Sequence, residues 1–116
     1  MAGEKYIVAA ADNPVQIAVR NILNPSGYGF LGNCGDAISL IRLVRSYHPE
    51  FIVVDTSIKI NELKNVLETV DDEMLCACVL LGEYRDTGIS SMLEGSRVLS
   101  FCLKPLSKEI FLQTVE

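Results

Sequence analysis

Residues 51–57 read Phe-Ile-Val-Val-Asp-Thr-Ser, an apolar, β-branched run that stops at a carboxylate. Consecutive large apolar residues without alternation are typical of a strand buried on both faces, as in a parallel sheet covered by helices. Asp55 then lies where that strand ends. Ligands of open α/β sheets bind at the carboxyl ends of the strands, so the run indicates a functional carboxylate. An aspartate that starts a turn or caps a helix is the alternative.

The composition bounds the class of protein. The 116 residues suit a single domain, 1–116, with one core. The net charge of −5 argues against direct nucleic-acid binding, which needs a basic face. The chain has neither an apolar run of the roughly 20 residues that a membrane span needs nor a signal-peptide pattern. We therefore expect a cytoplasmic protein that does not contact membranes.

The rest of the chain alternates strand and helix patterns. Strands are predicted at 5–11, 28–31, 51–55, 76–81 and 98–103. Helices are predicted to open at Asn13-Pro14, Cys34-Gly35-Asp36, Asn61 and Ser107, and a poorly encoded one lies within 83–97. Such alternation predicts an α/β fold, a doubly wound five-stranded parallel sheet with helices on both faces.

Helical spacing also predicts which side chains face the sheet. In the second helix these are Ala37, Leu40, Ile41, Val44 and Tyr47, and in the last helix Ile110, Phe111 and Val115. The cysteines Cys34, Cys76, Cys78 and Cys102 show no metal or redox spacing, so they are expected to pack in the core. His48 and the acidic run 71–73 are interpreted as solvated.

Three charged side chains follow predicted strands. Asp12, Asp55 and Lys104 should meet at one edge of the sheet. Two carboxylates offer hard oxygen ligands for magnesium, and a carboxylate can also form an acyl phosphate. Lys104 would hold a phosphoryl oxygen as a point charge.

With these residues in this order along the chain, the sequence resembles the receiver (CheY-like) domains of two-component response regulators, which have the flavodoxin-like strand order 2-1-3-4-5. The resemblance implies that Asp55 is the phosphoacceptor, with Asp12, Asp55 and the Ser57 carbonyl as ligands of a weakly bound Mg²⁺. It assigns Lys104 to the phosphoryl contact and the switch positions to Gly82 and Phe101.

Two departures from the family pattern bear on function. Ala11 stands where the family usually has a second acid. Gly82 stands where a Ser or Thr usually contacts the phosphoryl group, and Glu83 follows in place of a small residue. A glycine supplies no hydroxyl, so the usual coupling of phosphorylation to Phe101 would be absent or rerouted.

Two hypotheses follow from the resemblance. The first is a working receiver, a signalling domain rather than an enzyme, which accepts a phosphoryl group from a sensor histidine kinase and passes the signal to an output region, for instance in transcription regulation. The second is a degenerate receiver that acts as an interaction or homodimerisation module without phosphorylation.

A third hypothesis, a flavodoxin-like cofactor binder, predicts a Gly- or Ser-rich loop after the first strand. Asp12-Asn13-Pro14 is the opposite. The last helix carries no stop signal before Glu116, which favours an excised N-terminal portion of a longer protein.

Overall fold

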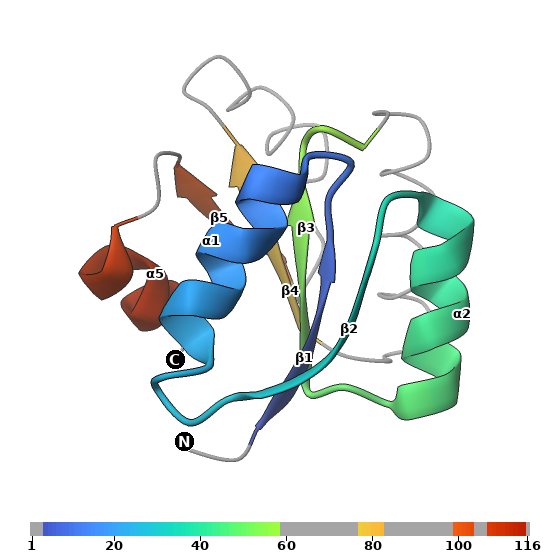
Figure 1. The fold of residues 1–116 in the computed structure, drawn as a ribbon, viewed down its shortest axis with the longest axis horizontal. Helices are drawn as coiled ribbons and strands as arrows, with labels where there is room; N and C mark the ends of the chain where they lie inside the picture. Colours follow the sequence, from blue (N-terminus) through green and yellow to red (C-terminus); the bar gives the residue numbers. More distant parts are fainter. Residues whose placement is uncertain (1–3, 59–76, 83–98, 104–106, 116) are drawn as a thin grey trace.

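The computed structural model describes residues 4–58, 77–82, 99–103 and 107–115. Its elements, in chain order, are β1 (Lys5–Ala9), α1 (Asn13–Leu23), β2 (Gly29–Cys34), α2 (Ala37–Tyr47), β3 (Phe51–Asp55), β4 (Ala77–Gly82), β5 (Leu99–Leu103) and α5 (Lys108–Val115) (Figure 1). The helices predicted from Asn61 and within 83–97 lie outside the described residues.

The five strands form one parallel sheet in the order β2-β1-β3-β4-β5, which confirms the predicted topology. β3 lies in the middle, and all five of its residues are buried. Its uninterrupted apolar run therefore reflects cover on both faces.

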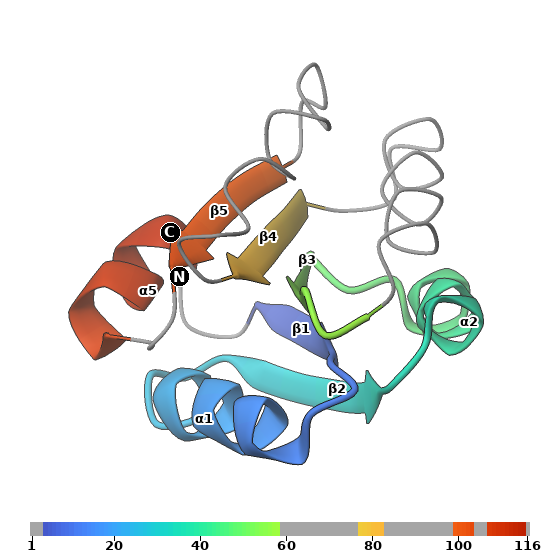
Figure 2. The ribbon, with the colours of Figure 1, turned by 90° about the horizontal axis from the view of Figure 1, so that it is seen from above.

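Two apolar clusters divide the core between the faces of the sheet. α2 packs on one face with Ile7, Ile52 and Leu80. α1 and α5 pack on the other with Tyr6, Val53 and Leu81 (Figure 2). Alternate residues of each central strand thus belong to opposite clusters, as the two-residue period of a strand requires.

The first two strands differ from the prediction at their ends. β1 stops at Ala9 rather than at residue 11, because the Ala10 carbonyl accepts a hydrogen bond from Gln16 Nε2 (2.7 Å) as the chain turns into α1. β2 runs to Cys34 rather than to Leu31, because the Ala10 N–H and the β1 register continue its pairing to that residue. α1 begins one residue earlier than predicted, with Asp12 at the N-cap position.

Two side chains expected to face the sheet are exposed instead. Tyr47 is 55% exposed because it is the last residue of α2 and lies beyond the cluster contacted by Leu40 and Val44. Ile110 is 60% exposed, whereas its neighbour Phe111 is fully buried. Adjacent helical residues point about 100° apart, so only one of the two can face the sheet.

Tyr6 is the centre of an aromatic cluster at the amino end of the sheet. Its ring centroid lies 5.7 Å from those of both Phe30 and Phe51, and Tyr28 meets Phe51 edge-on. The Tyr6 hydroxyl donates to Asn24 Oδ1 (2.6 Å). Burial raises the pKa of Tyr6 to about 12, with Arg20 acting weakly in the opposite direction.

The raised pKa of Tyr6 predicts a loss of stability in alkali. The unfolded state ionises near pH 10 and the folded state only near pH 12, so this contribution is fully present below pH 10 and is lost as the pH rises to 12. The loss should be about 2–3 kcal/mol. Urea unfolding across this pH range checks it, and Tyr6→Phe should lose less stability over the same interval. Equal pH dependence in both proteins would contradict the prediction.

Candidate functional site

Asp55 is the last residue of β3 and is buried, with 1% of its surface exposed. Its Oδ2 accepts a hydrogen bond from the Ser57 N–H (3.1 Å). The turn that follows is fixed by two further backbone bonds, from Thr56 N–H to Leu81 O (3.0 Å) and from Ile58 N–H to Asp55 O (3.2 Å). The carboxylate therefore has a set orientation at the carboxyl edge of the central strand.

The turn after β3 is joined to the loop between β1 and α1. Ser57 Oγ accepts a hydrogen bond from the Ala11 N–H (3.0 Å), and Asp12 is the next residue along that loop. The two loops lie side by side at the top of Figure 1. The structure thus brings together the loops that carry Asp12, Asp55 and Ser57. Asp12 is exposed, and its side chain makes no capping bond to α1.

The other candidate residues lie on or beyond the last two strands. Gly82 is buried at the end of β4 and pairs with Leu103 of β5. Phe101 lies in β5 opposite Leu80. Lys104 and Glu83 lie outside the described residues, so their placement at this edge stays a prediction.

A polar bridge that the sequence did not indicate supports the same loop. Gln16 in the first turn of α1 donates through Nε2 to the Ala10 carbonyl and accepts from Asn33 Nδ2 (2.6 Å) on β2. One side chain therefore ties α1 both to Ala10, the residue that follows β1, and to the edge strand β2. No sequence signal marks Gln16, because its partners come together only after the sheet forms.

The donor set at this edge consists of hard oxygens. Within residues 4–58 and the other described segments, no group of three His, Cys, Asp or Glu side chains could hold a metal ion. The predicted set needs only two such side chains, Asp12 and Asp55, because its third ligand is the Ser57 carbonyl. Mg²⁺ keeps several waters and is often bound through one or two carboxylates, so this donor chemistry fits it.

The described cysteines are packing residues. Cys78 and Cys102 are buried, and the half-buried Cys34 thiol donates weakly to the Val8 carbonyl (3.8 Å). Burial, with the nearby Asp36 carboxylate, raises the pKa of the Cys34 thiol to about 11. The thiol therefore stays protonated and unreactive near neutral pH.

No family model matches the chain, and no curated protein matches it in sequence. Solved structures match it closely in shape. The isolated receiver domain of RcsB from Salmonella enterica serovar Typhimurium superposes with a TM-score of 0.83 at 14% identity, covering 97% of this chain and 86% of that one. This chain has the receiver fold.

Two further receiver structures agree with this assignment. The signal receiver domain of an HD domain-containing protein from Pseudomonas fluorescens Pf-5 gives a TM-score of 0.84 at 12% identity, covering 97% and 91% of the two chains. The signal receiver domain of the putative response regulator NarL from Mycobacterium tuberculosis gives a TM-score of 0.79 at 13% identity, covering 99% of this chain and 94% of that one. The TM-scores establish the receiver fold. Because the identities are this low, the chemistry has to be argued from this chain's own residues.

None of the helices in the described segments is both long and apolar enough to span a membrane.

Proposed function

We propose that this receiver-fold chain accepts a phosphoryl group on Asp55 from a phosphohistidine of a sensor histidine kinase. The observation that carries the proposal is the buried, oriented carboxylate at the carboxyl end of β3, joined through Ser57 to the loop that bears Asp12. A carboxylate in such a position can act as a nucleophile toward phosphorus.

The transfer is a substitution at phosphorus. A carboxylate oxygen of Asp55 bonds to phosphorus as the phosphorus–nitrogen bond to the imidazole breaks, and the imidazole nitrogen keeps the electron pair. The Ser57 N–H holds Oδ2 and so aims the carboxylate. Bound Mg²⁺ supplies positive charge that offsets repulsion between carboxylate and phosphoryl oxygens. Asp12, Asp55 and the Ser57 carbonyl would hold it, and Lys104 would contact a phosphoryl oxygen.

Gly82 supports a second candidate function. It ends β4 as a buried residue with no hydroxyl, so it cannot pull on a phosphoryl group as a Ser or Thr would. The alternative is a degenerate receiver that serves as an interaction or homodimerisation module. In the first case a signal passes through Phe101 or another route to an output region, such as a transcription regulator. In the second, association is independent of Asp55.

The test is phosphorylation by a small donor. The protein is incubated with acetyl phosphate and Mg²⁺, and its intact mass is followed over time, with EDTA in a parallel sample. We expect the mass of one phosphoryl group to be added in the Mg²⁺ sample and peptide mapping to locate it on Asp55. No uptake over a range of donor and Mg²⁺ concentrations would overturn the proposal in favour of the degenerate receiver.

The missing second acid predicts that Mg²⁺ binding can be strengthened. Ala11 is exposed, and its N–H already donates to Ser57 Oγ, so Ala11→Asp adds a carboxylate without disturbing the backbone. A charge about 4 Å from the cation contributes about 1–4 kcal/mol in partly screened surroundings. Mg²⁺ affinity measured by calorimetry should therefore rise at least about fivefold.

Ala77→Asp is the matched control, because Ala77 is also exposed but begins β4, at the amino ends of the strands and away from their carboxyl ends, where Asp55 lies. It adds the same charge far from Asp55 and should leave the Mg²⁺ affinity unchanged. An equal gain in both variants would show that net charge, and not the predicted site, governs Mg²⁺ binding.

A further inference from the structure

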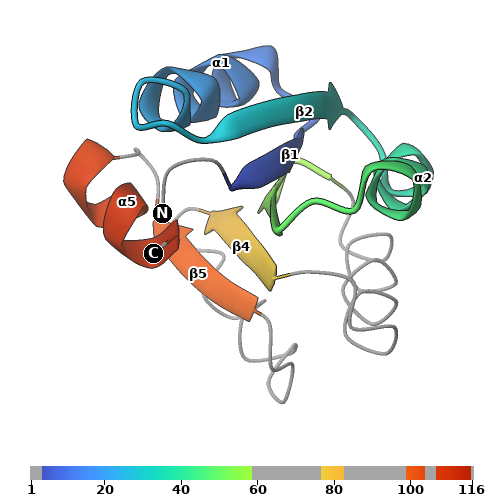
Figure 3. The same cartoon turned by 90° about the horizontal axis from the view of Figure 1, so that it is seen from below.

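Gln16 holds both ends of the short loop that leads from β1 into α1. Its side-chain Nε2 donates to the Ala10 carbonyl (2.7 Å), and its backbone N–H donates to the Asp12 carbonyl (3.4 Å). Its Oε1 accepts from Asn33 Nδ2 (2.6 Å) on β2. Figure 3 shows α1 running alongside β2, with β1 on the inner side of that strand. Both atoms of the Gln16 amide are therefore engaged, one of them on the loop itself.

The peptide unit between Ala10 and Ala11 is bonded at both of its polar atoms. Its carbonyl oxygen accepts from Gln16, and its N–H, on Ala11, donates to Ser57 Oγ (3.0 Å). The C=O and N–H of a planar trans peptide point in opposite directions. The bond from Gln16 therefore aims the Ala11 N–H at the turn after β3, and the peptide cannot rotate without losing both bonds.

The same contacts lead to the buried carboxylate. Ser57 accepts the Ala11 N–H through Oγ and donates its own N–H to Asp55 Oδ2 (3.1 Å). Gln16 is thus linked to Asp55 through one peptide unit and one serine. Asp12, the residue after Ala11, is exposed and makes no side-chain capping bond. The position of its carboxylate therefore depends on how the backbone before it is held.

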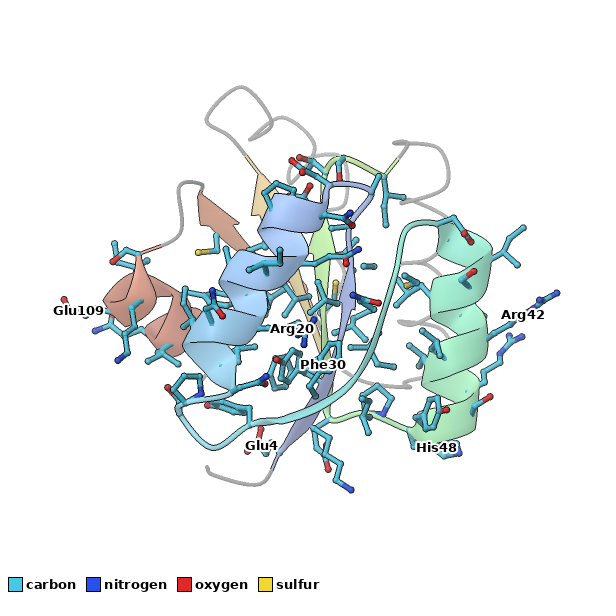
Figure 4. The ribbon with its side chains drawn as sticks, in the orientation of Figure 1. Glu4, Arg20, Phe30, Arg42, His48 and Glu109 are labelled. Atoms are coloured by element: carbon cyan, nitrogen blue, oxygen red, sulfur yellow. The ribbon has the colours of Figure 1, made fainter. Side chains whose placement is uncertain are left out.

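Other contacts keep α1 on the sheet without Gln16. Arg20 lies about one turn further along the helix, and its guanidinium carbon is 4.4 Å from the centroid of the Phe30 ring. Figure 4 shows these two side chains together between the helix and the strand. Val19 and Leu23 of α1 are buried in the core. Loss of the Gln16 amide should therefore leave the helix docked and release only the loop.

We propose that Gln16 is a positioning residue for the acidic site. By fixing the peptide between Ala10 and Ala11, it holds the Asp12 carboxylate where it shares Mg²⁺ with Asp55. This inference rests on the proposed function, because it concerns the same Mg²⁺. The competing explanation is that Gln16 only attaches α1 to the sheet, a task that the stacked arginine and the buried apolar side chains already perform.

The first test is Gln16→Met. Methionine is unbranched, of similar length and a good helix former, but it has no amide donor for the Ala10 carbonyl. Mg²⁺ affinity, measured by calorimetry, should fall about threefold to tenfold, the range that corresponds to one neutral hydrogen bond. Exchange of the Ala11 N–H with water, followed by ¹H–¹⁵N NMR without Mg²⁺, should become faster. Gln113→Met is the matched control, because Gln113 is exposed on α5, and it should change neither quantity.

A double-mutant cycle with Asp12→Asn separates positioning from attachment of the helix. In the Asp12→Asn background, Gln16→Met should change Mg²⁺ affinity by less than about twofold, because the carboxylate that Gln16 positions is gone. An equal loss in both backgrounds overturns the proposal, as does an unchanged Mg²⁺ affinity or an unchanged Ala11 exchange rate in Gln16→Met. Absence of Mg²⁺ binding by the wild type overturns the proposed metal site and this role with it, an outcome distinct from wild-type binding that Gln16→Met leaves intact.

Discussion

Asp55→Asn is expected to take up no phosphoryl group from acetyl phosphate under conditions that modify the wild-type protein. An amide is too weak a nucleophile to form the acyl phosphate. The substitution also removes one of the two carboxylates predicted to bind Mg²⁺. Intact mass spectrometry of both proteins after the same incubation measures this. Modification of the variant to the wild-type extent would place the acceptor elsewhere.

The structure predicts that Asp55→Asn folds normally. Asparagine has nearly the same volume, and its amide oxygen can accept the hydrogen bond that the Ser57 N–H now gives to Oδ2. The pairing of β3 with β1 and β4 uses backbone groups only. The free energy of unfolding, measured in urea, should therefore change by less than about 1 kcal/mol. A loss of phosphoryl uptake in this variant would then reflect the loss of the nucleophile and not a loss of folding.

Asp12→Asn is the matched comparison, because it neutralises the other predicted ligand and leaves the acceptor intact. Its uptake should persist but require more Mg²⁺ than the wild type. If instead it behaves as the wild type at every Mg²⁺ concentration, Asp12 is not a ligand.

The central strands were predictable because strands buried on both faces consist of consecutive apolar residues. The run from Phe51 to Val54 has no polar interruption and is β-branched, which is typical of a strand covered on both faces, and β4 shows the same pattern. β2 was harder to predict because it lies at the sheet edge, where its residues are only partly buried and Gly29 and Gly32 carry no apolar signal. Its length is set by pairing with β1, a contact distant in sequence.

The site was predictable only in part. The position of Asp55 follows from the end of a legible strand. The bond from Ala11 to Ser57 joins residues 46 positions apart and depends on how two loops meet. Arg20 shows the same limit, because an arginine on an amphipathic helix is expected in solvent, and only the fold reveals Phe30 beneath it. Local pattern therefore locates a residue on its element, and side-chain partners require the packed structure.

Phe111→Ala is expected to lower the free energy of unfolding by about 3–5 kcal/mol. Phe111 is fully buried in the cluster shared by α1 and the sheet, which includes Val79, Leu81 and Cys102. α5 has only eight residues, and a helix this short is not stable by itself in water. Among the described side chains of α5, Phe111 is the one that is fully buried, so its ring anchors α5 to the sheet. Urea unfolding, extrapolated to water, measures the loss.

Ile110→Ala is the matched control, since it also shortens an apolar side chain of α5 but at a residue 60% exposed. It should change stability by no more than about 0.5 kcal/mol, the usual range for surface substitutions. A comparable loss in both variants would contradict the prediction that burial of the Phe111 ring holds α5 in place, because alanine raises the helix propensity at both positions. A loss below about 1 kcal/mol in Phe111→Ala would show that the fold survives without docking α5, and that the sheet with α1 and α2 carries the stability.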